Sequence, residues 1–470
     1  MILKGFCRLW DNKAFRTALL AVFGAVGLFT VASGALRALG GSSEFREFRD
    51  IIQVSVVENK NHYVEIAHLR AYPPFFAIFW APYGLFPLGE LPDPARPLVS
   101  TTLSQKLQIG ASAALVLLVM TALAVWAARC VMLAGLHRAA PAEANPLRAN
   151  ALAADDRGKG WCAPALLGVL SGGLMVNAII RCETDMFVVM LVAGAMYLMF
   201  VRDLQWSSGA LLGVAAAFKL TPGLFGIYLL CRRKWSALAG MIAAGFACSV
   251  ILPAVVWGPQ GAYDRTRSWV EKVIIPYSAQ GPETFIAEAY RRANQSLKAA
   301  LTRYLTRYDV GSDRGVRRVN VADLPRQTVE KITLGLKAVI LALLLAAWIL
   351  PSPGREGDLG PVLFALVPTG MLLLSDVSTG SHLAILAVPL GTFAAFGLRH
   401  AGDSLGQTVS WGVLAGFAAA NLIAVQPLKE RSVGTLGILI LYGLGLYVAL
   451  HLLRLQRAPI AKEGARPGGS

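Results

Sequence analysis

The chain has 470 residues, of which 55% are hydrophobic and only 15% are charged, and its formal net charge is +16. Apolar runs long enough to cross a bilayer recur along it, so the composition excludes a soluble globular protein and predicts a polytopic membrane protein. The basic residues lie in separate loops, which argues against nucleic-acid binding. The six cysteines show neither metal-ligand nor disulfide-framework spacing.

The first apolar run covers about 18–39 and follows a basic N-terminal stretch without a convincing cleavage site. We therefore interpret it as a retained membrane span. A polar stretch over 40–71 comes next. The following apolar run, from Tyr72 to Leu91, contains Pro73, Pro74, Pro82 and Pro87. Because proline removes helical hydrogen bonds, we expect a re-entrant or interfacial segment here, not a spanning helix.

Further spans are predicted over the later apolar runs, at about 107–136, 161–180, 186–201, 235–257, 332–350, 360–375, 382–398, 409–426 and 433–453. Two short apolar runs flank Lys219, and the longest polar segment covers 258–330. The basic tail over 454–470 is expected to be disordered. Together these segments predict an all-α, polytopic fold with a single integral membrane domain over 1–470.

Charge indicates the orientation. With the N-terminus inside, the short basic loops at 137–160 and 231–234 and the basic tail also fall inside, as the positive-inside rule expects. This gives about twelve spans with both ends in the cytoplasm. The two large outer segments, 40–106 and 258–330, then share the outer face with the links 181–185 and 375–382 and with Lys219. The sequence thus predicts that widely separated ionisable residues converge on one compartment.

The stretch from Phe218 to Pro222 is the first candidate site. A lysine at membrane depth is costly and usually faces a polar cavity or an anion. Pro222 breaks the helix, so a second helix starting near Thr221 would point its N–H groups toward the same space. Lys219 and Thr221 are therefore candidate anion ligands. The alternative is a lysine that extends from a helix end to the membrane surface, next to an ordinary kink.

Acidic residues follow the first span. Glu44, Glu47 and Asp50 are spaced three apart, which places them on one side of a short helix. A carboxylate held just above the membrane can act as a general base toward a hydroxyl. A solvated helix with internal arginine–carboxylate pairs remains the alternative at this point.

Two later segments carry further candidates. Asn294 and Gln295 suit sugar hydroxyls, and Arg303 offers a fork that binds phosphate oxygens, so we expect Arg303 to contribute to phosphate binding. The same stretch also fits an amphipathic surface helix. In the link 375–382, His382 is a candidate for bonding a phosphate or hydroxyl, and an interfacial histidine satisfied by its own surroundings is the alternative.

Taken in order, these pieces resemble the polyprenyl-phosphate-dependent membrane glycosyltransferases of family 87, once called domain of unknown function 2029. Polyprenol-dependent mannosyltransferases of mycobacterial glycolipid synthesis belong to that family. The resemblance runs from about 40 to 390. The matching pieces are Glu44-Phe45, Tyr72-Pro73-Pro74, Gly209 to Pro222, Arg232 to Trp235, Asn294 to Leu297 with Arg303, and Ser375, Ser378 and His382 ahead of Pro389.

The resemblance implies an all-helical GT-C fold and transfer of a hexose, with mannose favoured, from a polyprenyl-phosphate sugar to a lipid or glycan acceptor at the outer face. It implies inversion at the sugar, with Glu44 as base where the family usually has Asp, and Asp50 as the fallback. Substrate-binding positions would be Lys219, Thr221, Tyr72, Glu183, Asp185, Asn294, Gln295, Arg303 and His382. We expect no metal or other cofactor, because lysine and arginine can supply the positive charge.

Two other functions fit the residues. A transporter or lipid-linked-sugar flippase would also use broken helices and buried charge, but it needs little external mass, and we find no inverted repeat. A non-catalytic membrane scaffold leaves the break at Lys219 to Pro222 unexplained. The expected partners are the lipid-linked donor, the acceptor and membrane lipids, without nucleic acid.

Overall fold

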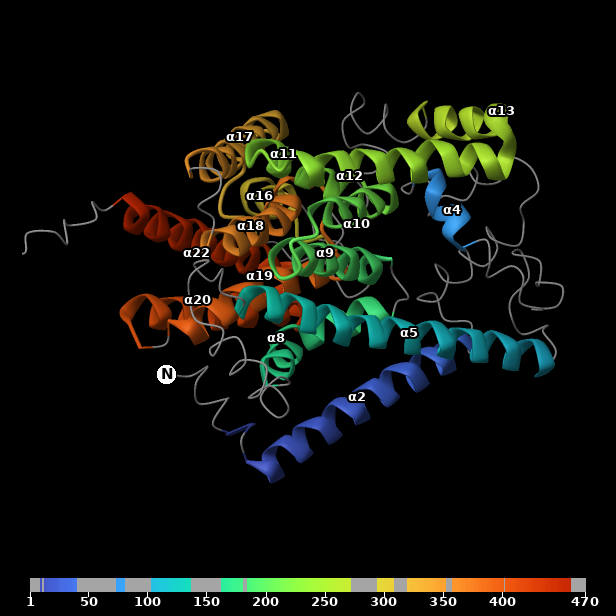
Figure 1. The fold of residues 1–470 in the computed structure, drawn as a ribbon, viewed down its shortest axis with the longest axis horizontal. Helices are drawn as coiled ribbons and strands as arrows, with labels where there is room; N and C mark the ends of the chain where they lie inside the picture. Colours follow the sequence, from blue (N-terminus) through green and yellow to red (C-terminus); the bar gives the residue numbers. More distant parts are fainter. Residues whose placement is uncertain are drawn as a thin grey trace, which may run out of the picture.

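A computed structural model describes residues 9–10, 12–39, 73–80, 103–136, 162–180, 184–271, 294–307, 319–351, 357–400 and 402–457. Every regular element in these ranges is helical (Figure 1). The helices are α2 (Lys13–Leu39), α4 (Pro74–Trp80), α5 (Leu103–Leu136), α8 (Cys162–Ile180), α9 (Asp185–Phe200), α10 (Gln205–Phe218), α11 (Leu224–Cys231), α12 (Trp235–Phe246), α13 (Leu252–Trp269), α16 (Leu297–Leu305), α17 (Arg326–Ile349), α18 (Leu359–Leu374), α19 (Ala387–Arg399), α20 (Ser404–Asn421), α21 (Gln426–Glu430) and α22 (Val433–Arg457).

The centre of the bundle is α18, whose residues from Leu359 to Leu373 are all buried. Helices α9 and α19 are also largely buried. These helices are apolar on all sides, which suits positions surrounded by other helices. Helix α2 lies at the edge of the bundle, where only 6% of its apolar window is buried (Figure 1).

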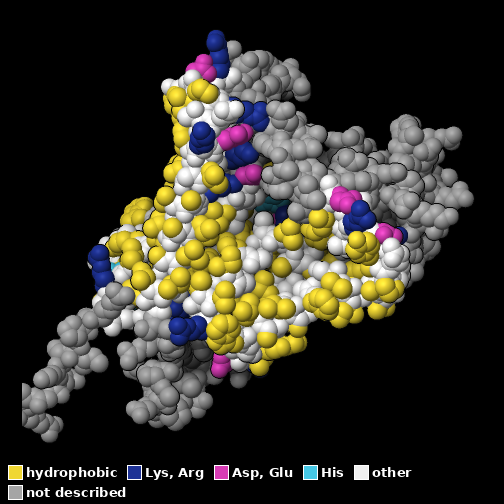
Figure 2. All heavy atoms as spheres, turned by 90° about the horizontal axis from the view of Figure 1, so that it is seen from above, with side chains coloured by type: hydrophobic (Ala, Val, Ile, Leu, Met, Phe, Trp, Pro, Cys, Tyr) yellow, Lys and Arg dark blue, Asp and Glu magenta, His cyan; other side chains and the backbone are white. Residues whose placement is uncertain are grey.

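Seven helices in the described part of the chain are long and apolar enough to cross a membrane. Four more apolar helices are shorter, namely α8, α9, α18 and the helix formed by residues 221–223 together with α11. Figure 2 shows hydrophobic side chains gathered in a broad band on one face, with charged side chains mostly toward its ends. The chain is thus a multi-pass membrane protein, and the count of about twelve spans stays a prediction.

The helix after Trp235 differs from its prediction. We expected the span to end near Trp257 and a polar loop to follow. Instead, the helix continues through a π-helical segment at Ala247–Ile251 and then kinks, and helical structure resumes up to Trp269. The kink lies at Gly258, with φ 73° and ψ 159°, which only glycine adopts without strain. Proline is well suited to the first turn of a helix, so the chain can begin a new helical segment at Pro259 directly after the kink.

Helices α10 and α12 approach each other through glycines. A Cβ atom on Gly209 would lie 1.7 Å from the carbonyl oxygen of Ala237, and one on Gly213 would lie 2.2 Å from that of Met241. Small residues four apart allow such backbone contact between membrane helices. This contact fixes α10, and therefore the residues that follow its end, against the outer part of the bundle.

Candidate functional site

The helix break predicted around Lys219 is present. Helix α10 ends at Phe218, Lys219 is extended with φ −154° and ψ 130°, and a 3-10 turn over Thr221–Gly223 leads into α11. Pro222 lacks an N–H group, so an uninterrupted α-helix through it would lose a hydrogen bond. The break turns the Lys219 side chain out of the helical path.

Phe218 is held by an aromatic cluster beside this break. Its ring lies 4.9 Å from that of Phe75 and 4.6 Å from that of Phe79, both on α4, measured between ring centroids. Phe187 on α9 lies 5.2 Å from Phe79. These edge-to-face contacts join α4, α9 and α10 directly next to Lys219 and Asp185.

Four predicted residues meet at this point, namely Asp185, Lys219, Thr221 and His382. The Nζ atom of Lys219 lies 2.7 Å from Oδ1 of Asp185, across 34 positions of sequence. The Nε2 atom of His382 lies 3.8 Å from Oδ2 of the same carboxylate. All four residues line one pocket. Helix α9 and the turn that precedes α19 start here, and helices α10 and α18 end here. The polar groups therefore gather at one end of the bundle.

Hydrogen bonding sets the proton position on His382. The backbone N–H of Thr379 donates to its Nδ1 atom at 3.1 Å. Nδ1 therefore acts as an acceptor, and the proton of the neutral ring lies on Nε2, which faces Asp185. The imidazole can thus offer one N–H donor to a group in the pocket.

The pocket is open, with an empty volume of about 420 Å³ that includes solvent at its mouth. The lining combines a carboxylate, an amine, an imidazole and hydroxyl groups with apolar side chains. The lining residues are Asp185, Val188, Lys219, Thr221, Met371, Leu372, Ser375, Val377, Ser378, His382 and Ile385. Such a lining suits a ligand with an anionic or hydroxylated head and an apolar remainder.

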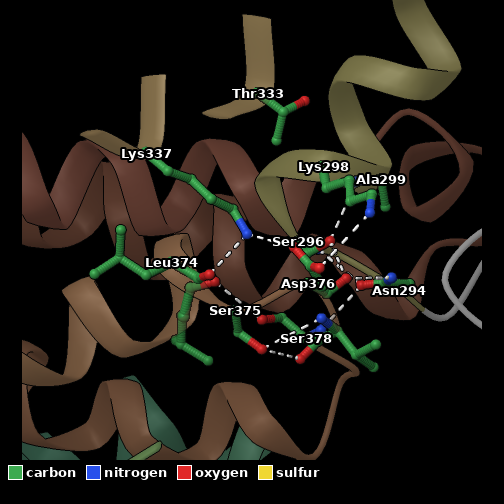
Figure 3. Close-up of polar contacts among 12 residues, drawn as sticks. Asn294, Ser296, Lys298, Ala299, Thr333, Lys337, Leu374, Ser375, Asp376 and Ser378 are labelled. Atoms are coloured by element: carbon green, nitrogen blue, oxygen red, sulfur yellow. Dashed lines mark hydrogen bonds and ion pairs between the residues drawn. The ribbon is translucent and has the colours of Figure 1, made fainter. Parts of the chain in front are cut away.

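Asn294, Gln295 and Arg303 are not among these lining residues. Asn294 accepts from the backbone N–H of Ser378 at 2.9 Å through Oδ1, and its amide donates to the carbonyl of Asp376 at 3.1 Å (Figure 3). Gln295 donates from its backbone to Ser378 and from its side chain to the carbonyl of Lys429. Asn294 and Gln295 thus hold the wall of the pocket from behind.

Arg303 also lies behind that wall, and its side chain is fully buried. Nη1 donates to the hydroxyl of Ser432, and Nη2 donates to the carbonyl of Asn294 at 2.7 Å. The first bond joins α16 to the turn before α22, and the second holds the segment that precedes α16. The arginine that we expected at a donor phosphate therefore has protein oxygens as its partners.

The remaining predicted site residues, Glu44, Asp50, Tyr72 and Glu183, lie outside the described residues. Within the described ranges, no group of three or more His, Cys, Asp or Glu side chains is placed to hold a metal ion. The sequence reasoning overlooked Lys298 and Lys337, which contact Asp376. A lysine within the apolar run 332–350 was the signal that could have identified Lys337.

The model of glycosyltransferase family 87 matches residues 71–378. The chain belongs to glycosyltransferase family 87. The pocket residues from Asp185 to Ser378 lie inside the match to this family, whereas His382 and Ile385 lie beyond its end.

One relative is the polyprenol-phosphate-mannose-dependent alpha-(1-2)-phosphatidylinositol pentamannoside mannosyltransferase of Mycolicibacterium smegmatis. It is 32% identical over 177 residues, which are 38% of this chain and 35% of that protein. The similarity thus spans about a third of that relative's length. No solved structure matches the chain significantly.

Proposed function

We propose that this family 87 protein transfers a hexose, with mannose favoured, from a polyprenyl-phosphate sugar to a lipid or glycan acceptor at the outer face of the cytoplasmic membrane. The observation that carries the proposal is the convergence of Lys219, Asp185 and His382 on one pocket at a helix break, in a chain that belongs to family 87. The donor named for the mycobacterial relative is of the same class.

In the proposed reaction, the acceptor hydroxyl attacks the anomeric carbon of the donor sugar. The bond between that carbon and the phosphate oxygen breaks, and polyprenyl phosphate leaves with both electrons of the bond. Glu44 takes the hydroxyl proton, with Asp50 as the alternative base. Attack opposite the leaving group inverts the anomeric configuration.

The phosphate side of the reaction is assigned to Lys219 and His382. The amine supplies fixed positive charge, and the N–H on Nε2 donates to a phosphate oxygen as charge develops on it. Asp185, which bonds the amine, and Thr221 line the same pocket, and we assign both to substrate binding. These cationic and N–H groups can stabilise the leaving group without a metal, so we expect transfer to persist in the presence of EDTA.

The test is product analysis with purified protein in proteoliposomes. Radiolabelled polyprenyl-phosphate mannose, glucose and arabinose are supplied in turn, and label is followed into lipid and glycan fractions. Transfer from the mannose or glucose donor supports the proposal, whereas transfer from the arabinose donor alone would show a pentosyltransferase. Absence of transfer from every donor, together with movement of the labelled lipid across the bilayer, would instead support a flippase.

Two variants separate the proposed roles. Glu44→Gln should keep donor binding and lose about 10²–10⁴-fold in turnover, because an amide cannot accept the proton.

Lys219→Ala should weaken both donor binding and turnover, because the phosphate is charged before the reaction as well. Lys331→Ala, an exposed lysine on α17, serves as the control. If Glu44→Gln stays active while Asp50→Asn is inactive, the base is Asp50, and if both stay active the carboxylate mechanism fails.

A further inference from the structure

A second group of charged residues lies outside the pocket. Lys337 on α17 pairs with Oδ1 of Asp376 and also donates to the carbonyl oxygen of Leu374 at 2.7 Å (Figure 3). Lys298 on α16 places its Nζ atom 3.6 Å from Oδ2 of the same carboxylate. The two ammonium groups thus share one carboxylate, and the group retains one positive charge in excess.

The group lies directly behind the pocket. Ser375, Val377 and Ser378 line the pocket, whereas the side chain of Asp376 meets the lysines. Because the chain is extended at Ser375, with ψ 144°, neighbouring side chains point to opposite sides. A single backbone segment therefore separates the pocket from the lysines.

Lys337 also lies next to an exposed apolar side chain. Lys337 is the twelfth residue of α17, roughly 16 Å along the helix from Arg326. Leu334, three residues earlier and therefore adjacent on the helix surface, is 70% exposed, and Val339 is 55% exposed. Helix α17 is one of those long and apolar enough to cross a membrane. The charged group therefore lies between the polar link 375–382 and the exposed apolar face of α17.

We propose that Lys298 and Lys337 bind the phosphate group of an anionic lipid, with Asp376 as the internal counter-ion that the lipid phosphate partly replaces. The lipid's hydrocarbon chain would lie along the exposed apolar side chains of α17. This site is separate from the transfer reaction, and binding alone tests it.

The chemistry of the cluster favours this ligand. Lysine is a compact charge on a flexible chain and binds phosphate as a point charge without a fixed fork. The 3.6 Å distance leaves Lys298 the looser partner of Asp376, so it can turn to a new oxygen at little cost. Asp376 is 31% exposed, so a head group can reach the cluster from outside. An apolar ligand would leave the excess charge uncompensated, and a purely water-soluble anion would make no use of the apolar surface beside it.

The experiment measures binding of fluorescent phosphatidylglycerol and phosphatidylcholine to the full chain in detergent, with inorganic phosphate as competitor. Lys298→Gln and Lys337→Gln should each weaken binding of the anionic lipid by about tenfold. Asp376→Asn should strengthen it, since it removes the competing carboxylate and keeps the backbone carbonyl that binds Ser296 and Asn294. Lys331→Gln changes the charge of the same helix equally and should have no effect.

The opposite signs separate binding from structure. If the cluster only joined α16, α17 and α18, all three substitutions would lower thermal stability and none would tighten lipid binding. That result would overturn the proposal, as would equal binding of phosphatidylcholine. Competition by inorganic phosphate as strong as that of the lipids would show a plain anion site and overturn the lipid assignment. Lys298→Gln keeps the bond from Lys337 to Leu374 intact, so it tests binding even if Lys337→Gln folds poorly.

Discussion

Lys219 and Arg303 are both basic residues proposed from the sequence as phosphate ligands, and their surroundings in the structure differ. The side chain of Lys219 is 20% exposed and lines the pocket. Arg303 is fully buried, and its guanidinium donates to Ser432 and Asn294. A charge that is fully buried must have partners close by, and the partners of Arg303 are protein oxygens, whereas Lys219 lines the pocket.

Replacing Arg303 should therefore act first on stability. In Arg303→Lys, one amine cannot reproduce two separated hydrogen bonds, and in Arg303→Met both Ser432 and the Asn294 carbonyl lose their donor. We expect a loss of about 2–4 kcal/mol in the free energy of unfolding. Thermal unfolding of detergent-purified protein measures it, with exposed Arg202→Lys as control. If the stability is unchanged while the affinity for the donor falls, Arg303 contacts the donor phosphate directly.

At the scale of elements, the contact between α10 and α12 determines where Lys219 lies. Carbonyl oxygens of the facing helix occupy the space that a side chain would need at Gly209, Gly213 and Gly240. Backbone atoms cannot move aside as the end of a flexible side chain can, so the two helices must separate if a methyl group is added. Separation would shift the end of α10 and the lysine that follows it.

Gly209→Ala is expected to lower the melting temperature and to reduce transfer, with a cost of about 1–3 kcal/mol in stability. Gly443→Ala is the matched control, because nothing lies within 4 Å of its added Cβ atom. Thermal unfolding and the transfer assay are run on both variants. Equal melting temperatures for the two would show that α10 and α12 pack less closely than described.

The sequence predicted the helices well because each apolar run shows its own hydropathy, independent of its neighbours. It also predicted the break at Lys219, since Pro222 acts locally. It did not predict which charges pair. The contact between Asp185 and Lys219 and that between Lys337 and Asp376 depend on how helices far apart in the chain pack. The extension of α13 to Trp269 was missed because its mixed, polar composition there gives no spanning signal.

At the scale of the whole molecule, the ends of the helices fall into two groups. The starts of α9 and of the turn before α19, and the ends of α10 and α18, gather around the pocket. The turn at Asp203 joins the other ends of α9 and α10, and the capped start of α20 follows the other end of α19. At that start, the backbone N–H of Gly406 lowers the pKa of Asp403, which caps the helix. From charge patterning we predict that the pocket group lies outside and the other group in the cytoplasm.

Cysteine labelling of intact cells tests this orientation. The six native cysteines are first replaced, and single cysteines are introduced at Asn150 and at Val321, whose side chain is 80% exposed. A membrane-impermeant maleimide should label Val321→Cys in intact cells and Asn150→Cys only after the cells are opened. The reverse pattern would place the pocket in the cytoplasm.

The ion pair between Lys219 and Asp185 has a consequence for turnover. It makes the empty pocket close to neutral, whereas a donor phosphodiester carries one negative charge and the departing phosphate monoester carries about 1.5–2 at neutral pH. A pocket with unopposed cations would hold the more highly charged product more tightly than the substrate. In the proposed reaction, we expect Asp185 to offset that preference and to favour product departure. Asp185→Asn should therefore make polyprenyl phosphate a stronger competitive inhibitor, measurable as a lower inhibition constant relative to the KM for donor.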